Sequence, residues 1–251
     1  MRFRSKALGL HLLISTVLLT LVLGSLYLGW YRWPGWYLAG ASTVVLVLAG
    51  VDLALGPLLT FVVASPGKPR RELTRDISII AAMQLLALGY GTAQLWNGRP
   101  LYYAFSENVL QLVQAYDIEA PERALGLENN PGLSPHWYSL PRWIWAPLPQ
   151  DPAVRERIIG SAVSGGSDVI DMPRYFRPWV DGLPSLRAQL KKLDEQTFFS
   201  KSEKRLLRER MLARGLSPDQ ANAIPFIGRG PRMLAVLDPA SVTMLAVLAS
   251  R

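Results

Sequence analysis

The sequence contains no cysteine and only two histidines among its 251 residues. Without cysteine, the chain can form no disulfide framework, no thiolate metal site and no cysteine nucleophile. Residues 99–251 contain a single histidine, His136, and no serine in a Gly-x-Ser-x-Gly elbow. The glycine-rich stretch GSAVSGGSD lacks the lysine and the spacing of a phosphate loop. The sequence therefore predicts no catalytic residue, no metal site and no cofactor, and a protein that is not an enzyme.

Acidic residues are scarce in the first third of the chain. Residues 1–99 hold nine Lys and Arg against three Asp and Glu, whereas residues 100–251 hold eighteen against sixteen. Most of the net charge of +8 therefore belongs to the most apolar part of the sequence. A nucleic-acid-binding patch would gather its basic residues on a water-soluble face, with motifs that this sequence lacks. We therefore expect a membrane-attached protein that has no nucleic-acid partner.

Three long apolar runs cover residues 7–28, 37–64 and 77–96. At about 1.5 Å per helical residue, about 20 residues cross a hydrocarbon core of about 30 Å. The first run follows Arg2, Arg4 and Lys6 and has no clear cleavage site, so we interpret it as an uncleaved anchor and not as a signal peptide. The sequence predicts three transmembrane α-helices in residues 1–98, followed by an α+β domain in residues 99–251.

The basic residues predict how these helices cross the membrane. Four of them lie in the connection at 65–76, but only one lies in the connection at 29–36. The positive-inside rule then places the N-terminus and residues 65–76 in the cytoplasm, and an odd number of spans exports residues 99–251. Aromatic residues, which favour membrane interfaces, gather at the predicted outer ends of the spans. These residues are Tyr27, Trp30, Tyr31, Trp33, Trp36, Tyr37 and Trp96.

The second apolar run contains one carboxylate, Asp52. A charged side chain at the centre of a bilayer costs about 2.5–3.5 kcal/mol on insertion scales, so Asp52 should face other helices or a polar pocket. Small and polar residues recur at helical spacing on two runs, namely Ala49, Asp52, Gly56 and Thr60 on the second and Gln84, Ala87, Gly91 and Gln94 on the third. Such stripes let membrane helices approach closely and form hydrogen bonds, so we expect the two stripes to face each other.

A helix-breaking pair, Gly56-Pro57, follows Asp52 in the same run. Pro57 has no N–H group, so the carbonyl of Leu53 would lose its helical partner and the helix should kink. In lipid, that carbonyl needs another partner, for which Thr60, Gln84 or a water is suitable.

Three interpretations of Asp52 remain open. The carboxyl is protonated or bonded to Gln84 and only packs the helices, because its neutral form costs less to keep in lipid. Alternatively, Asp52 and Asp76 form the dyad of an intramembrane enzyme, although a separation of about 18 Å along a helix disfavours a shared proton. In the third interpretation, Asp52 recognises a polar group on the membrane helix of a partner.

Residues 99–251 combine strand and helix signals. RPLYYAF and NVLQLVQAYDI predict a hairpin, and two runs around residues 238–241 predict another. We expect helices from Asp151-Pro152 to about Val163, from the capping box of Ser200 and Glu203 to Gly215, and briefly from Ser217. Leu186, Leu190 and Leu193 predict the apolar stripe of a basic helix. Residues 117–150 are expected to form an irregular connection that is packed by its own aromatic residues.

Four motifs together resemble the TfpX/TfpZ family of type IV pilin accessory proteins. They are HLLISTVLL, GVDLALGPLLTFVV, RDISIIAAMQLLALGYG and RPLYYAFSENVLQLV, and they cover roughly residues 8–115. After residue 116 only IPFIGRGPR and the hairpin after it look similar. The family-like positions are Asp52, Gly56, Pro57, Asp76, Arg99 and Pro100.

The resemblance implies a bacterial inner-membrane protein whose periplasmic domain and spans support the assembly of a particular pilin. The implied partners are the type IV major pilin, the lipid bilayer and other pilus assembly proteins. We predict that Asp52, Gly56, Pro57, Thr60, Gln84 and Gly91 pack the helices or bind the partner, and that Asp76, Arg99 and Pro100 lie at the membrane edges. The alternatives are a membrane enzyme that modifies or cleaves pilin through Asp52, and a sensor, which the short inner loops disfavour.

Overall fold

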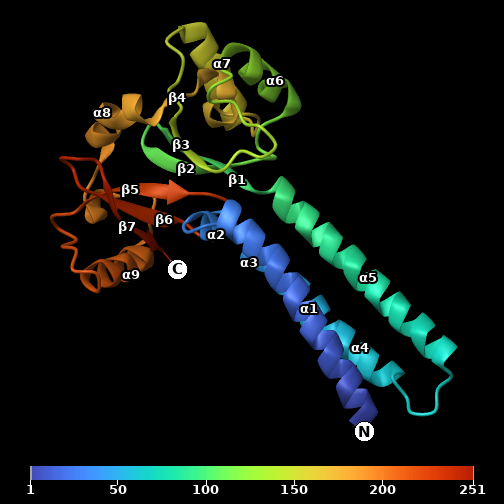
Figure 1. The fold of residues 1–251 in the computed structure, drawn as a ribbon. Coiled ribbons are helices and arrows are strands. Elements are labelled where there is room, and N and C mark those ends of the chain that lie inside the picture. Colours follow the sequence, from blue (N-terminus) through green and yellow to red (C-terminus); the bar gives the residue numbers. More distant parts are fainter. Residues whose placement is uncertain (1, 251) are drawn as a thin grey trace. The chain divides into compact units, whose positions relative to one another are not determined.

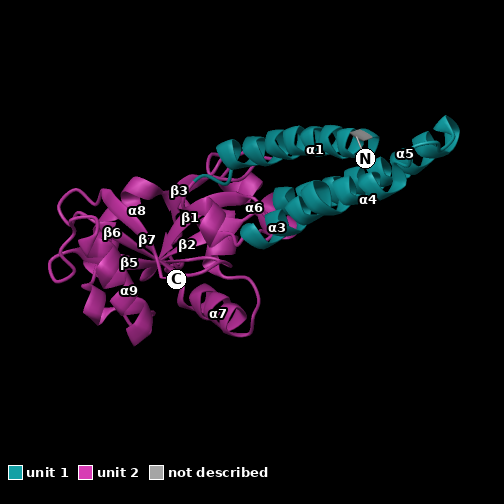
Figure 2. Cartoon of the chain, turned by 90° about the horizontal axis from the view of Figure 1, so that it is seen from below, with its two compact units in different colours: residues 1–32, 41–97 teal, residues 33–40, 98–251 magenta. Residues whose placement is uncertain are grey.

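The computed structural model describes residues 2–250 and divides the chain into two compact units (Figures 1 and 2). The first unit contains the chain up to Arg32 together with Ala41–Asn97. The second unit contains Trp33–Gly40 and the chain from Gly98 onward. The chain therefore passes between the two units at three places, after Arg32, after Gly40 and after Asn97.

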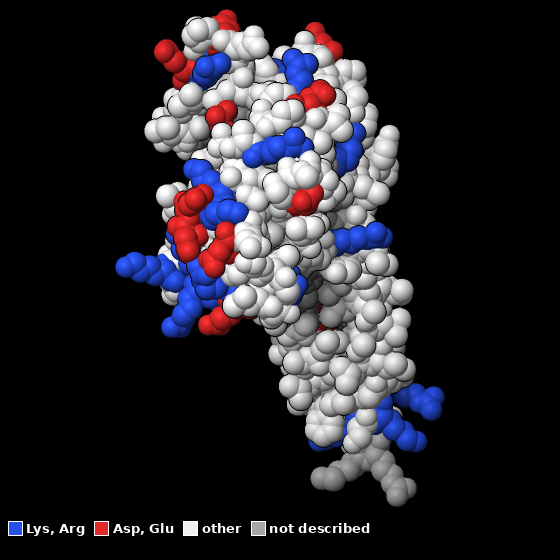
Figure 3. Space-filling model, turned by 90° about the vertical axis from the view of Figure 1, so that its left-hand side faces the viewer, with Lys and Arg blue, Asp and Glu red and all other residues white. Residues whose placement is uncertain are grey.

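The first unit consists of three long helical segments. The first is α1 (Arg2–Gly29), the second joins α3 (Ser42–Ala49), η1 (Gly50–Leu55) and α4 (Gly56–Val63), and the third is α5 (Arg70–Asn97). Each segment is long and apolar enough to cross a membrane, over Phe3–Gly29, Ser42–Val63 and Arg70–Asn97. On the face drawn in Figure 3, this unit carries few charged side chains along its length, and Lys and Arg gather at one end. The predicted fold class of three membrane helices followed by an α+β domain is confirmed.

A seven-stranded mixed sheet forms the centre of the second unit. The strand order is β4-β3-β1-β2-β5-β6-β7, with parallel pairing of β1 to β3 and of β2 to β5 and antiparallel pairing elsewhere. The strands are β1 (Pro100–Ser106), β2 (Val109–Gln114), β3 (Arg142–Trp145), β4 (Arg177–Pro178), β5 (Asn222–Ile227), β6 (Met233–Leu237) and β7 (Met244–Ala249).

Helices cover both faces of this sheet, because its strands carry buried apolar side chains on each face. One face packs against α8 (Trp179–Gln189) and Leu38 of the short helix α2 (Gly35–Leu38). The opposite face packs against α7 (Pro152–Val163) and the 3₁₀ turn η2 (Val169–Asp171) at one end of the sheet, and against α9 (Lys201–Leu212) at the other. The remaining elements are α6 (Ala120–Asn129), η3 (Pro173–Tyr175) and η4 (Leu193–Glu195).

Several local predictions for this unit are confirmed. β1 and β2 form the expected hairpin, and Glu107 in its turn has a positive φ of 51°. Asp151 caps α7 by accepting from the N–H groups of Ala153 (2.9 Å) and Val154 (3.4 Å). Ser200 and Glu203 form the predicted capping box of α9, and β6 and β7 form the last hairpin.

Other predictions for this unit are wrong. Residues 117–150 are not an irregular connection, because they contain α6 and the strand β3. The basic helix with a leucine stripe ends at Gln189, so Leu190 lies beyond α8 and Leu193 belongs to η4. The short helix expected from Ser217 is absent, because residues 218–220 form a turn. Strand β5 was not predicted at all, since it contains Pro225, which is unfavourable inside a sheet.

A polar cluster inside the helical unit

A π-helical turn interrupts the second membrane helix just before Pro57. The N–H group of Gly56 donates to the carbonyl of Val51, which lies five residues earlier and not four. This turn contains Asp52, whose residue is only 4% exposed. Such turns are rare and are found frequently at functional sites. The irregularity was predicted as a kink at Pro57, but it lies in the preceding residues.

Gln84 of α5 donates a hydrogen bond to a backbone carbonyl that this turn leaves without a helical partner. In the five-residue pattern, the missing N–H of Pro57 leaves the carbonyl of Asp52 without a donor. Gln84 Nε2 donates to that carbonyl and to the Asp52 carboxylate oxygen Oδ1, each at 3.4 Å. Gln84 is among the partners that the sequence predicts for a freed carbonyl, although the carbonyl is that of Asp52 and not of Leu53.

Two glycines permit this close contact between helices. A Cβ atom at Gly56 would lie 2.1 Å from Gln84 Nε2, so a larger residue would occupy the position of the amide. A Cβ atom at Gly91 would lie 2.4 Å from Leu48 Cδ2. Membrane helices use small residues in this way to bring their surfaces together.

His11 of α1 joins the cluster, although it was not predicted from the sequence as a site residue. Its Nδ1 lies 2.6 Å from Thr60 Oγ1, and its Nε2 lies 2.5 Å from Gln84 Oε1. Because an amide oxygen only accepts, Nε2 carries a proton and, in a neutral imidazole, Nδ1 accepts from the Thr60 hydroxyl. Hydrogen bonds then run from Thr60 through His11 and Gln84 to Asp52. The only indication in the sequence was that His11, a polar residue, lies inside the first apolar run.

Two small cavities open beside this cluster, and both are lined by α1 and α5. The first has a volume of about 170 Å³ and is lined by His11, Ile14, Ser15, Leu18, Asp52, Ala81, Gln84, Leu85 and Leu88. The second, of about 240 Å³, is lined by His11, Thr60 and apolar residues of α1 and α5. The second carboxylate oxygen of Asp52 is buried and has no hydrogen-bond partner among the described residues. The first cavity is therefore lined by a residue whose carboxylate has one unpaired oxygen.

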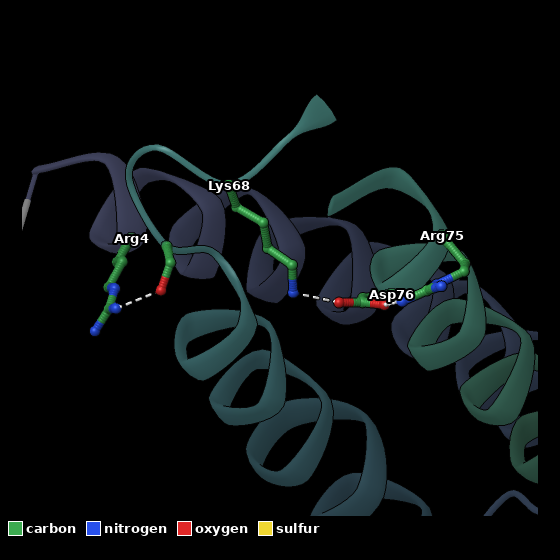
Figure 4. A network of polar contacts seen from close by, with 5 residues as sticks. Arg4, Lys68, Arg75 and Asp76 are labelled. Carbon is green, nitrogen blue, oxygen red and sulfur yellow. Dashed lines mark hydrogen bonds and ion pairs between the residues drawn. The ribbon is translucent and has the colours of Figure 1, made fainter. Parts of the chain in front are cut away.

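Asp76 belongs to a separate polar network at one end of the unit (Figure 4). Its carboxylate contacts Lys68 and lies 3.3 Å from both Nε and Nη2 of Arg75. Nearby, Arg4 Nη2 donates to Ser65 Oγ at 2.6 Å. Asp76 precedes Gln84 by eight residues, or about 12 Å along a helix, so the arrangement does not favour a dyad with Asp52. No group of three His, Cys, Asp or Glu gathers in a metal-binding arrangement in the described part of the chain.

The other predicted edge residues lie where α5 ends and the sheet begins. Within the helical unit, Trp30 contacts Trp96 at 4.9 Å between ring centroids, and the Tyr31 hydroxyl donates to the carbonyl of Leu95 at 2.7 Å. Beyond Asn97, the carbonyl of Arg99 accepts from the N–H of Ala115 at 3.0 Å, and Pro100 is the first residue of β1.

The connection between the first two membrane helices forms part of the second unit. Leu38 is fully buried in the core on one face of the sheet. The N–H of Gly230 donates to the carbonyl of Leu38 at 2.6 Å. A Cβ atom at Gly228 would lie 2.4 Å from the Leu38 carbonyl oxygen, and one at Gly230 would lie 1.9 Å from that of Tyr37. These glycines belong to the IPFIGRGPR motif and let the connection lie against the sheet. The second helix consequently begins at Ser42 and not at residue 37.

Comparison with known proteins finds relatives that cover almost the whole chain. It is similar to the fimbrial assembly protein of serogroup E1 of Dichelobacter nodosus, with 24% identity over 243 residues, 94% of this chain and 91% of that protein. The serogroup I protein of the same organism matches at 24% identity over 242 residues, again 94% and 91%. The protein of serogroups C1 and C2 is 31% identical over 116 residues, which are 46% of this chain and 88% of that protein. No protein-family model and no solved structure matches the chain.

Proposed function

The chain belongs to the family of fimbrial assembly proteins, and from that premise we propose that it binds a cognate type IV pilin in the membrane and promotes its assembly into pili. In this proposal it is an accessory factor of the TfpX/TfpZ kind in a bacterial inner membrane, with its N-terminus in the cytoplasm and the sheet domain in the periplasm. The family membership supports a role in pilus assembly, and the three long apolar helices support a membrane protein.

The observation that carries the proposal is the Asp52 cavity between α1 and α5. A pilin that waits in the bilayer must keep an apolar N-terminal helix there, together with the polar groups at the start of that helix. A polar group in lipid gains most from a partner that is already held in place. In this proposal Asp52 Oδ2 provides such an acceptor, and a hydrogen bond from Gln84 Nε2 to Oδ1 helps to position the carboxylate.

A second contact would act together with the first. The sheet domain is connected to the helical unit at three places, so a pilin held by its helix would present its head close to that domain. Binding at both levels raises the effective concentration for the second contact once the first has formed. We therefore assign the membrane cavity to the pilin helix and the sheet domain to the pilin head.

Site-specific photo-crosslinking in cells tests this assignment. Leu85 and Leu86 of α5 are both exposed. Leu85 lines the Asp52 cavity, and Leu86 is not among the described residues that line it. A photoreactive amino acid at position 85 should crosslink to pilin, and the same amino acid at position 86 should not. Asp52→Leu should reduce the crosslinks from position 85 while the protein remains inserted.

Two outcomes would contradict the assignment. Equal crosslinking from both positions would show that pilin does not use this cavity. Unchanged crosslinking and normal piliation in the Asp52→Leu variant would leave Asp52 as a residue that only packs the helices.

A further inference from the structure

An exposed aromatic turn lies in the second unit between α6 and β3. Trp137, Tyr138 and Leu140 are 71%, 58% and 56% exposed. From the sequence, the aromatic residues of this region were expected to pack the connection at residues 117–150. Trp143 packs inside the domain, since it contacts Tyr103 and Trp179 in the core, but the three side chains of the turn do not. Large apolar side chains that gather on a surface mark a contact with another molecule or with a membrane.

Hydrogen bonds hold the backbone of this turn in one conformation. The N–H of His136 donates to Ser139 Oγ at 2.8 Å, and the N–H of Ser139 donates to the carbonyl of His136 at 3.1 Å. The Arg142 guanidinium donates to carbonyls of the preceding residues, including that of Ser134 at 3.2 Å. The turn is therefore built to present its side chains outward, so their exposure does not result from a lack of structure.

The turn is tied to the end of the third membrane helix. Arg99 Nη2 donates to the carbonyl of Trp137 at 3.0 Å, and Arg99 follows Asn97, the last residue of α5, by two positions. Trp96, which pairs with Trp30, is an aromatic residue of the kind that marks a membrane interface. The three residues of chain from Trp96 to Arg99 span at most about 11 Å, which is about a quarter of the full bilayer thickness of about 40–45 Å. The covalent chain thus keeps the turn close to the point where α5 leaves the hydrocarbon core.

We propose that residues 136–140 form a membrane-interface anchor, in which Trp137, Tyr138 and Leu140 lie among the phospholipid glycerol and headgroup regions around the end of α5. Tryptophan and tyrosine favour this layer because the ring is apolar and its N–H or O–H group can still meet water. Leu140 adds purely apolar surface. The anchor would fix the sheet domain against the membrane next to the span.

The proposal depends on α5 crossing the bilayer and not on pilin binding, so the two can fail separately. We assign lipid and not a protein as the occupant, because the turn is bonded to Arg99, two residues after the end of α5. This connection does not depend on any protein partner. Protein burial of the same side chains is the competing result, and the test distinguishes it.

Spin labels measure this directly, since the chain contains no cysteine. Tyr138→Cys and Leu140→Cys are each labelled with a nitroxide in the full-length protein, reconstituted into phosphatidylethanolamine and phosphatidylglycerol vesicles. Leu86→Cys, exposed on α5, gives the lipid reference, and Ser202→Cys, exposed among the charged residues of α9, gives the water reference. Collision rates are measured with oxygen, which concentrates in lipid, and with a nickel chelate, which stays in water.

The anchor predicts intermediate values at positions 138 and 140: labels there should collide with the chelate less than the label at 202 but more than the label at 86, and with oxygen more than the label at 202 but less than the label at 86. Chelate collision at 138 and 140 equal to that at 202 would overturn the proposal, because the turn would lie in water. Protection from both reagents would also overturn it, because protein and not lipid would cover the turn. The use of two label sites guards against a local disturbance by either substitution.

Discussion

Gly56 allows Gln84 to reach the irregular turn around Asp52. In its place a methyl group would overlap the Gln84 amide, which hydrogen bonds to His11 and to Asp52 hold in position. Each member of this cluster depends on another helix, since His11, Asp52 and Gln84 come from three different segments. Polar contacts of this kind specify how membrane helices pair, because apolar surfaces alone do not distinguish a neighbouring helix from lipid.

We therefore expect Gly56→Ala to lower the free energy of unfolding of the purified protein in mild detergent by about 1–3 kcal/mol, the usual cost of overpacking. In a Gln84→Ala background the same substitution should cost much less, because the amide that it displaces is gone. Gly89→Ala is the matched control, since a Cβ atom at Gly89 has no neighbour within 4 Å. Equal stabilities of the Gly56→Ala and Gly89→Ala proteins would contradict the role of Gly56.

At the scale of elements, the connection at Trp33–Gly40 belongs to the sheet domain although it joins two membrane helices. The backbone of this connection packs so closely against Gly228 and Gly230 that neither position has room for a side chain. The contact atoms are carbonyl oxygens, which cannot move aside as the end of a flexible side chain can. A helical membrane unit and a sheet domain thus share one short segment of chain.

Gly230→Ala should release this segment, because its Cβ atom would meet the Tyr37 carbonyl oxygen at 1.9 Å. We expect a loss of stability of about 3 kcal/mol or more and a clear rise in hydrogen exchange at residues 33–40. Gly160→Ala in α7 serves as control, since it meets no neighbour within 4 Å and a helix favours alanine. Protection of residues 33–40 that is the same in both variants would show that the two glycines do not hold the connection.

The elements that local chemistry determines were predicted from the sequence. Apolar length predicts the three membrane segments, Asp151-Pro152 and the Ser200–Glu203 box predict where α7 and α9 begin, and alternation predicts the β1–β2 hairpin. Elements that depend on distant partners were missed. β5 contains Pro225, which argues locally against a strand, yet β5 pairs with β2, more than 100 residues earlier, and with β6.

The same distinction applies to the candidate site. Asp52, Gly56, Thr60 and Gln84 were evident as members of small and polar stripes, because their spacing along each helix is a local property. Pro57 was evident as a helix breaker. His11 was not evident as a site residue, since one polar ring in an apolar run does not reveal which helices it will meet. Its role depends on Thr60 and Gln84, which lie 49 and 73 residues away in the sequence.

For the whole molecule, the shared connection bears on the proposed membrane orientation. Residues 33–40 and the chain from Gly98 onward lie in one unit, so the end of α1 and the end of α5 face the same side. The opposite ends carry the basic network of Arg4, Lys68 and Arg75. The positive-inside rule would place these basic ends in the cytoplasm, which is the orientation that we propose and in which the sheet domain is exported.

Co-purification from a gentle detergent extract of the cell that makes this protein tests the central claim most directly. The full-length protein should retain one type IV pilin and not the others, and the Asp52→Leu variant should retain less of it while a Leu86→Ala variant retains the wild-type amount. Recovery of no pilin by the folded wild-type protein would contradict the account. Equal recovery of every pilin, unaffected by Asp52→Leu, would contradict it as well.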